Sequence, residues 1–148
     1  MRTISALLVM LWLTACATTG MYNSPDGDDT ALIRIENLID AGNKQQAAGG
    51  WVMPGANTAT KVGLFTIDGD RLDATGGDQQ ARVDAGKHRV QIFADGGTAL
   101  RFKKFSLNAR AGAEYVVKVE KADAAQASYR AVVVDAAAPD DVITEVTF

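Results

Sequence analysis

Short runs of apolar and β-branched residues, separated by turns rich in glycine and aspartate, most constrain how this chain of 148 residues can fold. Lys61–Ile67 has the composition of a strand, and Asp68-Gly69-Asp70 directly after it is a turn sequence. Similar runs occupy residues 88–94, 99–108, 114–120 and 128–135. No connection between them has the pattern of a crossover helix, so a parallel α/β sheet is not expected. The pattern predicts an all-β fold, a single antiparallel β-sandwich.

Two further segments are assigned with more difficulty. Residues 30–38 fit both the alternation of a strand and the spacing of a helix, and the β-branched Ile33 and Ile35 favour the strand. Residues 136–140 are expected to form a linker before a last edge strand at 142–148.

The N-terminal residues have the features of a signal peptide. Arg2 provides a positive start, and residues 4–13 form an apolar run that is too short to span a bilayer as a helix. Residues 18–29, which follow a few positions later, are polar and contain glycine, proline and several aspartates. That composition is typical of a flexible connection.

Leu13-Thr14-Ala15-Cys16 resembles the lipobox of bacterial lipoproteins, in which a branched apolar residue and two small residues precede a cysteine. The resemblance implies cleavage between Ala15 and Cys16, followed by S-diacylglycerol and N-acyl modification of Cys16. Ala17, in place of an aspartate, implies sorting to the outer membrane. The chain would then divide into a signal peptide (1–15), a lipidated cysteine with its tether (16–29) and a sandwich domain (30–148). The alternative is an ordinary secretory signal, because Ala15-Cys16-Ala17 also fits a small-x-small cleavage site.

Composition narrows the chemistry that the chain can support. Its 15 basic and 18 acidic residues give a formal net charge of −3, with no basic footprint for nucleic acid and no polybasic run for anionic lipid. One cysteine excludes an internal disulfide, and one histidine excludes sites that need two. Asp68-Gly69-Asp70 with Asp73 lacks the ligand spacing of a calcium loop. No metal and no cofactor are therefore expected.

Three segments resemble the pattern of PEGA-type surface domains, namely Phe65-Thr66-Ile67-Asp68-Gly69, Val83-Asp84-Ala85-Gly86-Lys87-His88-Arg89-Val90 and Ala111-Gly112-Ala113-Glu114-Tyr115. In that pattern an Ile-Asp-Gly turn is followed by a Gly-x-His-x-Val strand and then by a strand after Ala-Gly-x-x-Tyr. The resemblance covers roughly residues 61–119. It implies a β-sandwich in the PEGA or immunoglobulin-like style that serves as a non-catalytic envelope module.

Four residues are candidates for ligand contact: His88, Trp51, Lys103 and Lys104. His88 could act as a base, but no serine lies in a nucleophile elbow, and a histidine that starts a strand more often binds backbone. Lys103 and Lys104, flanked by phenylalanines, could contact an anion or a glycan, although edge-strand charges also prevent edge pairing. The two lysines interrupt the alternation of their strand, which suggests a bulge. Trp51 could bind a ligand or cover the core.

These observations predict a non-catalytic lipoprotein of the outer membrane, facing the periplasm, that binds or scaffolds another envelope component. The expected partners are the membrane, through the lipid anchor, and an envelope protein or cell-wall polymer, but not nucleic acid. The alternative is a small cell-wall-directed enzyme, or an enzyme inhibitor, that uses a polar site near His88.

Overall fold

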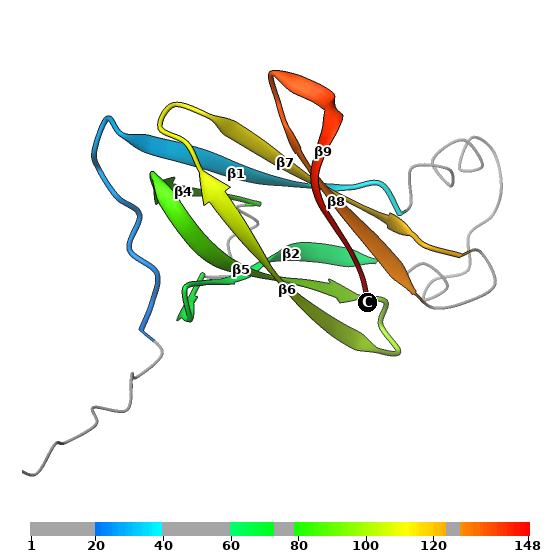
Figure 1. Ribbon diagram of the computed structural model, residues 1–148. Helices are drawn as coiled ribbons and strands as arrows, with labels where there is room; N and C mark the ends of the chain where they lie inside the picture. Colours follow the sequence, from blue (N-terminus) through cyan, green and yellow to red (C-terminus); the bar gives the residue numbers. More distant parts are fainter. Residues whose placement is uncertain (1–19, 40–59, 73–78, 124–127) are drawn as a thin grey trace, which may run out of the picture.

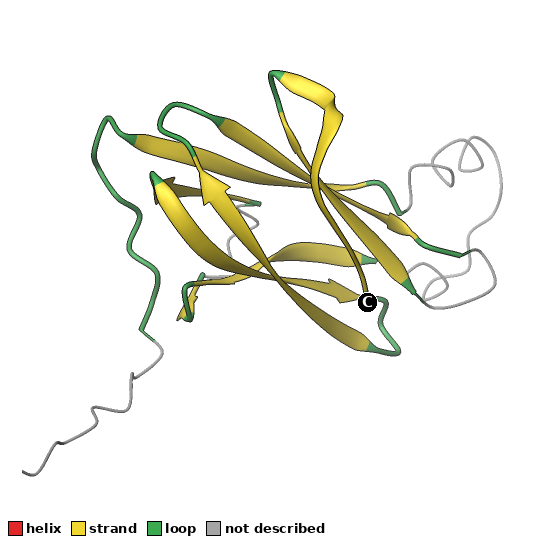
Figure 2. Cartoon of the chain, in the orientation of Figure 1, coloured by secondary structure: helices red, strands yellow, loops and turns green. Residues whose placement is uncertain are grey.

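The computed structural model describes residues 20–39, 60–72, 79–123 and 128–148, which form nine β-strands. The strands are β1 (Thr30–Asn37), β2 (Lys61–Ile67), β3 (Asp70–Arg71), β4 (Gln80–Asp84), β5 (Gly86–Asp95), β6 (Leu100–Ala109), β7 (Glu114–Lys121), β8 (Tyr129–Asp135) and β9 (Ala138–Thr147). Every regular element of the described part is a strand (Figure 2). No helix in these ranges is long and apolar enough to cross a bilayer. The all-β prediction is confirmed, and residues 30–37 form a strand.

The strands build two layers (Figure 1). The larger sheet has the order β4-β1-β7-β8-β9, and the smaller sheet has the order β3-β2-β5-β6. This arrangement confirms the predicted sandwich. One pair departs from the antiparallel pattern, because β1 and β7 run parallel, with Leu32 opposite Glu114. The parallel pair joins segments that are far apart in the sequence, which local alternation does not reveal.

Inward-facing side chains of both sheets form one core. In β5, Val90, Ile92 and Ala94 are fully buried, while the residues between them keep some exposure. In β7, the buried face is formed by Tyr115, Val117 and Val119, as the alternation predicts. The largest fully buried side chains are Tyr115, Ile33, Ile67, Ile92, Leu107, Val83, Val90, Val117, Val119 and Val133.

The turn between β2 and β3 forms at the predicted Asp68-Gly69 sequence. Asp68 and Gly69 have φ angles of 54° and 100°. Both lie in the left-handed region, which glycine adopts without steric cost and aspartate tolerates better than most residues. This backbone geometry is what a two-residue hairpin turn requires.

The predicted bulge at Lys103 and Lys104 is wrong. β6 pairs with β5 in an unbroken register, from Gly86 opposite Ala109 to Asp95 opposite Leu100. The bulge lies instead on β2, where Leu64 pairs with Ile92 and Thr66 pairs with Gln91, so that Phe65 is the extra residue. Phe65 and its two neighbours, Leu64 and Thr66, are neither glycine nor charged, so the sequence does not mark this bulge.

The predicted linker at 136–140 is also wrong. Ala136 and Ala137 form a turn, and β9 starts at Ala138 and runs along β8. The predicted last edge strand is present but longer than expected. Its register against β8 shifts twice, at Val133–Val134 and at Val134–Asp135, which explains why its alternation is weak in the sequence.

A buried tyrosine connects the β6–β7 turn to the core. Tyr115 is 1% exposed, and its hydroxyl accepts a hydrogen bond from the backbone N–H of Arg110 at 3.0 Å. The same hydroxyl lies 3.4 Å from the carbonyl oxygen of Asn108, to which it donates. This arrangement is similar to the tyrosine corner of many β-sandwiches.

The described part of the N-terminal connection is attached to the edge of the small sheet. Arg71 N–H donates to the carbonyl of Gly20, and Tyr22 N–H donates to the carbonyl of Arg71, both at 2.9 Å. The Tyr22 hydroxyl donates to the carbonyl of Arg82. Burial, together with the negative charge of Asp84, raises the pKa of Tyr22 to about 12. Residues 20–22 therefore continue the small sheet beyond β3.

Candidate functional site

Three of the residues singled out in the sequence lie outside the described residues. They are Ala15 and Cys16, at the predicted cleavage and lipidation site, and Trp51. The remaining candidates, His88, Lys103 and Lys104, all lie on the small sheet.

His88 is the third residue of β5, and its ring lies against two acceptors. Its Nδ1 lies 2.6 Å from Asp68 Oδ2, and its Nε2 lies 2.8 Å from the carbonyl oxygen of Asp84. The other oxygen of Asp68 accepts the backbone N–H of Arg89 at 2.7 Å. Burial alone would raise the pKa of Asp68, but the Arg89 amide and the His88 ring hold it below its usual range. The His88–Asp68 pair therefore fastens the β2–β3 turn to β5.

The two adjacent lysines of β6 point to different sides of the sheet. Alternation places Lys103 on the side of Phe105, which is a buried core residue, whereas Lys104 shares the outer face with Phe102. The predicted contact for an anion or glycan, formed by the two lysines with Phe102 and Phe105, is therefore divided between two faces. Only Phe102 and Lys104 remain available to a ligand on the outer face.

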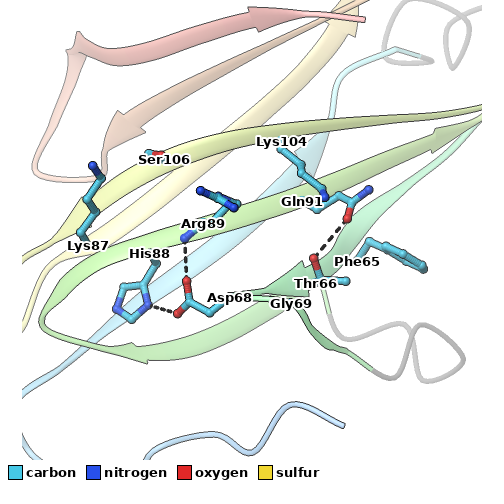
Figure 3. A pocket seen from close by; sticks show the side chains of 10 residues that line it. All are labelled: Phe65, Thr66, Asp68, Gly69, Lys87, His88, Arg89, Gln91, Lys104 and Ser106. Atoms are coloured by element: carbon cyan, nitrogen blue, oxygen red, sulfur yellow. Dashed lines mark hydrogen bonds and ion pairs between the residues drawn. The ribbon is translucent and has the colours of Figure 1, made fainter. Parts of the chain in front are cut away.

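An open hollow of about 530 Å³ lies over the outer face of the small sheet (Figure 3). It contains both His88 and Lys104, and it brings in several residues that were not predicted. The residues that line it are Phe65, Thr66, Asp68, Gly69, Lys87, His88, Arg89, Gln91, Lys104 and Ser106.

The polar part of the hollow is formed by cross-strand neighbours of β2, β5 and β6. Arg89 lies opposite Ser106, and Gln91 lies between Lys104 on one side and Thr66 on the other. The Thr66 hydroxyl donates to Gln91 Oε1 at 3.2 Å, so the amide group of Gln91 remains oriented with its NH₂ available as a donor. Lysine, arginine and amide N–H groups here present donors to an incoming anion.

Aromatic rings form the other end of this face. Phe65 packs edge-on against Phe93, with ring centroids 6.5 Å apart. It also packs against Phe102 in a tilted arrangement, with ring centroids 4.8 Å apart. The guanidinium carbon of Arg71 lies 5.4 Å from the centre of the Phe65 ring, within range of a cation–π contact. Gly63 makes room for Phe93, because a Cβ atom at Gly63 would lie 2.6 Å from that ring. Phe102 is 41% exposed.

The two outer faces of the sandwich differ in how their charges are arranged. On the large sheet, Arg34 pairs with Glu114 at 3.2 Å, and Arg130 pairs with Glu145 at 2.8 Å and with Glu120 at 3.1 Å. On the small sheet, the described residues contain no ion pair to Lys87, Arg89 or Lys104. Within the described part of this sheet, the one contact between a basic side chain and a carboxylate joins His88 and Asp68.

We define the cationic face as the outer side of β2, β3, β5 and β6 around four side chains: Arg71, Lys87, Arg89 and Lys104. Of these four, the sequence prediction named only Lys104; it missed Arg71, Lys87 and Arg89, and it also missed Gln91 and Phe65. The signal for two of them was present, because Arg89 and Gln91 alternate with the buried Val90 and Ile92. Alternation identifies these residues as outward-facing, but it does not show which other strands lie beside them.

The described residues contain no cluster of three or more histidine, cysteine, aspartate or glutamate side chains that could hold a metal. The Asp68 turn is occupied by its contacts to His88 and Arg89. The cationic face is suited to anions by its charge, and to flat apolar groups by its rings.

Comparison with protein-family models, with curated proteins and with solved structures finds no match to this chain.

Proposed function

We propose that this chain is a lipid-anchored, non-catalytic protein of the bacterial outer membrane that uses the cationic face to bind an anionic envelope component. The lipobox-like sequence ending at Cys16 supports the anchor. The position of the face on a sheet supports a binding role, because the backbone that carries its side chains needs no rearrangement to meet a ligand.

One observation carries the binding proposal. The chain has a net charge of −3, yet the small sheet presents Arg71, Lys87, Arg89 and Lys104 on one side. On the opposite side of the molecule Arg34 and Arg130 are paired with carboxylates. Asp68 is the carboxylate nearest to Arg89, but it is held by His88 and by the Arg89 backbone N–H, and none of the four cations is in a salt bridge among the described residues. Cations outside salt bridges attract anions more strongly than cations in salt bridges do, since less of their charge is compensated.

The geometry of His88 supports a non-catalytic role. A general base needs a ring nitrogen within reach of a substrate proton. Both nitrogens of His88 already face acceptors, the Asp68 carboxylate and the Asp84 carbonyl. The histidine-based enzyme alternative would require one of these contacts to break before the reaction. That alternative would be favoured if the wild-type chain had a measurable hydrolytic activity and a His88→Ala variant stayed folded but lost it.

The anchor is tested by metabolic labelling. Cells that express the full-length chain are grown with an alkyne analogue of palmitate, and the protein is isolated and coupled to a reporter. We expect label on the wild-type chain and none on Cys16→Ala, because the thiol is the site of lipid attachment. An unlabelled wild-type chain would contradict the anchor.

The binding face is tested with a soluble polyanion. The chain from Cys16 to Phe148, which contains every described strand, is titrated with dextran sulfate and with uncharged dextran. Two surface charges that each contribute about 0.5 kcal/mol to an ionic contact correspond to a roughly fivefold change in affinity. We therefore expect the double variant Arg89→Gln/Lys104→Gln to bind dextran sulfate about fivefold more weakly.

The matched control is Arg82→Gln/Lys118→Gln, which removes the same charge from the outer side of the large sheet. This control should bind dextran sulfate like the wild type. Equal loss in both double variants would mean that only net charge matters, and it would contradict a dedicated face. No binding of the wild type would contradict the proposal as well.

A further inference from the structure

Resting on the proposed function, we infer that the anionic component is the membrane surface that holds Cys16. The cationic face lies against the phosphate groups of its lipid heads. This assigns one occupant to the face and one orientation to the anchored domain.

The first argument is the place where the N-terminal segment meets the domain. Gly20 and Tyr22 hydrogen-bond to the backbone of Arg71, at the β3 edge of the small sheet. The guanidinium of the same Arg71 lies over Phe65 on the cationic face. The point of attachment and the face therefore share a residue.

The second argument is the short length of chain between that point and the lipid. Cys16 and Gly20 are four residues apart, and four extended residues span at most about 14 Å. A diacylglycerol group on Cys16 would lie in the bilayer, so Gly20 stays within about 14 Å of the head-group region. The β3 edge is thereby kept next to the membrane, and the neighbouring face can reach the surface by a simple tilt of the domain.

The third argument is charge complementarity. Lipid heads with a net negative charge, such as phosphatidylglycerol, make an anionic surface, and basic residues are attracted to it over roughly one Debye length, about 8 Å at physiological ionic strength. Lys87, Arg89 and Lys104 lie on adjacent strands, so that a flat surface meets all three together. The large sheet offers a surface in which cations and carboxylates alternate, which a uniformly anionic membrane does not favour.

The fourth argument is the exposed apolar side chains at the rim of the face. Phe102 is 41% exposed and Leu100 is 55% exposed; alternation along β6 places both on the outer side. Met21, in the attached N-terminal segment, is 64% exposed. Aromatic and aliphatic side chains beside cations are typical of proteins that lie on a membrane interface.

The test uses the single cysteine of the chain. The protein from Cys16 to Phe148 is coupled through Cys16 to a maleimide-headgroup lipid in nanodiscs, which reproduces the anchor at its natural position. One set of discs contains phosphatidylcholine only, and the other contains about one third phosphatidylglycerol. A gadolinium-chelating lipid in both sets broadens the NMR signals of backbone amides that approach the surface.

In anionic discs we expect stronger broadening of Arg89 and Lys104 amides than of Arg34 and Lys118 amides on the opposite sheet. The difference should be lost in phosphatidylcholine discs and at high salt, because both remove the electrostatic attraction. Each basic residue near an anionic surface contributes roughly a fivefold factor, so Arg89→Gln/Lys104→Gln should reduce the face-down population by about 25-fold. The control Arg82→Gln/Lys118→Gln should leave the broadening pattern unchanged.

Equal broadening of the two faces in anionic discs, or the same pattern in neutral discs, would overturn the inference. If the soluble chain still binds dextran sulfate through the same face, only the membrane assignment falls, and a cell-wall or other anionic polymer becomes the ligand. If dextran sulfate binding is absent too, the proposed function itself falls. The two failures are therefore distinguishable.

Discussion

Removing the hydroxyl group of Tyr115 tests whether its hydrogen bonds stabilise the β6–β7 turn. Replacing Tyr115 by phenylalanine keeps the ring in the core but removes the acceptor for Arg110 N–H and the donor to the Asn108 carbonyl. The substitution removes two hydrogen bonds, and each contributes about 1 kcal/mol. We therefore expect the free energy of unfolding to fall by about 2 kcal/mol.

For a domain of slightly more than 100 residues, 1 kcal/mol corresponds to about 4 °C in Tm, so the expected decrease is about 8 °C. The measurement is thermal unfolding by circular dichroism, with urea unfolding to confirm that the m value is unchanged. Cys16→Ser in all variants prevents dimerisation through the thiol.

Tyr129→Phe is the matched control. Tyr129 is also buried, at 7% exposure, and its ring packs against Phe148. Among the described residues no hydrogen bond reaches its hydroxyl, so the substitution removes the same atom without removing a bond. We expect a change in Tm of less than about 2 °C, corresponding to roughly 0.5 kcal/mol. An equal decrease in Tm for Tyr115→Phe and Tyr129→Phe would refute the idea that the hydrogen bonds of Tyr115 stabilise the β6–β7 turn.

Two further substitutions test the structure of the small sheet. Gly63→Ala should lower the free energy of unfolding by about 1–3 kcal/mol in urea unfolding, because the new methyl group would lie 2.6 Å from the Phe93 ring. The control is Gly27→Ala, which should be tolerated because a methyl group there meets nothing closer than 4.0 Å. Asp68→Asn should lower Tm at neutral pH, and its difference from the wild type should shrink as the pH falls below about 4. The pKa of Asp68 is lowered in the folded state, so its stabilising contribution is complete above the unfolded-state pKa and is lost as the carboxylate becomes protonated. A difference between the two proteins that persists unchanged to pH 2 would contradict the Asp68 assignment, and Asp26→Asn, at an exposed position, serves as the control.

The strands were predictable where pattern and turn chemistry act locally. The bounds of β2 and the Asp68-Gly69 turn follow from seven residues of strand composition and a hairpin sequence. The buried face of β7 follows from the alternation of Tyr115, Val117 and Val119. The position of the bulge on β2 and the pairing of β1 with β7 did not follow, because both depend on which strands become neighbours.

The candidate site was predicted only in part for the same reason. Lys104 and His88 were identified one at a time, and the sequence contains no polybasic run. Arg71, Arg89 and Lys104 come from three separate strands and meet only after the small sheet forms. Charge that is spread evenly along the sequence can thus become one-sided in space, which net charge and local runs do not reveal.

The parallel contact between β1 and β7 has a consequence for how the domain reaches its native state. β1 acquires its second neighbour only when a segment about eighty positions further along the chain has arrived. An exported polypeptide that emerges with its N-terminus first would carry β1 unpaired on this side until most of the sequence has crossed. Contacts of such large sequence separation slow folding, since a long loop must close before they form. The strand nearest the proposed anchor would therefore be among the last to become fully enclosed, and a chain truncated before β7 would leave it exposed to aggregation.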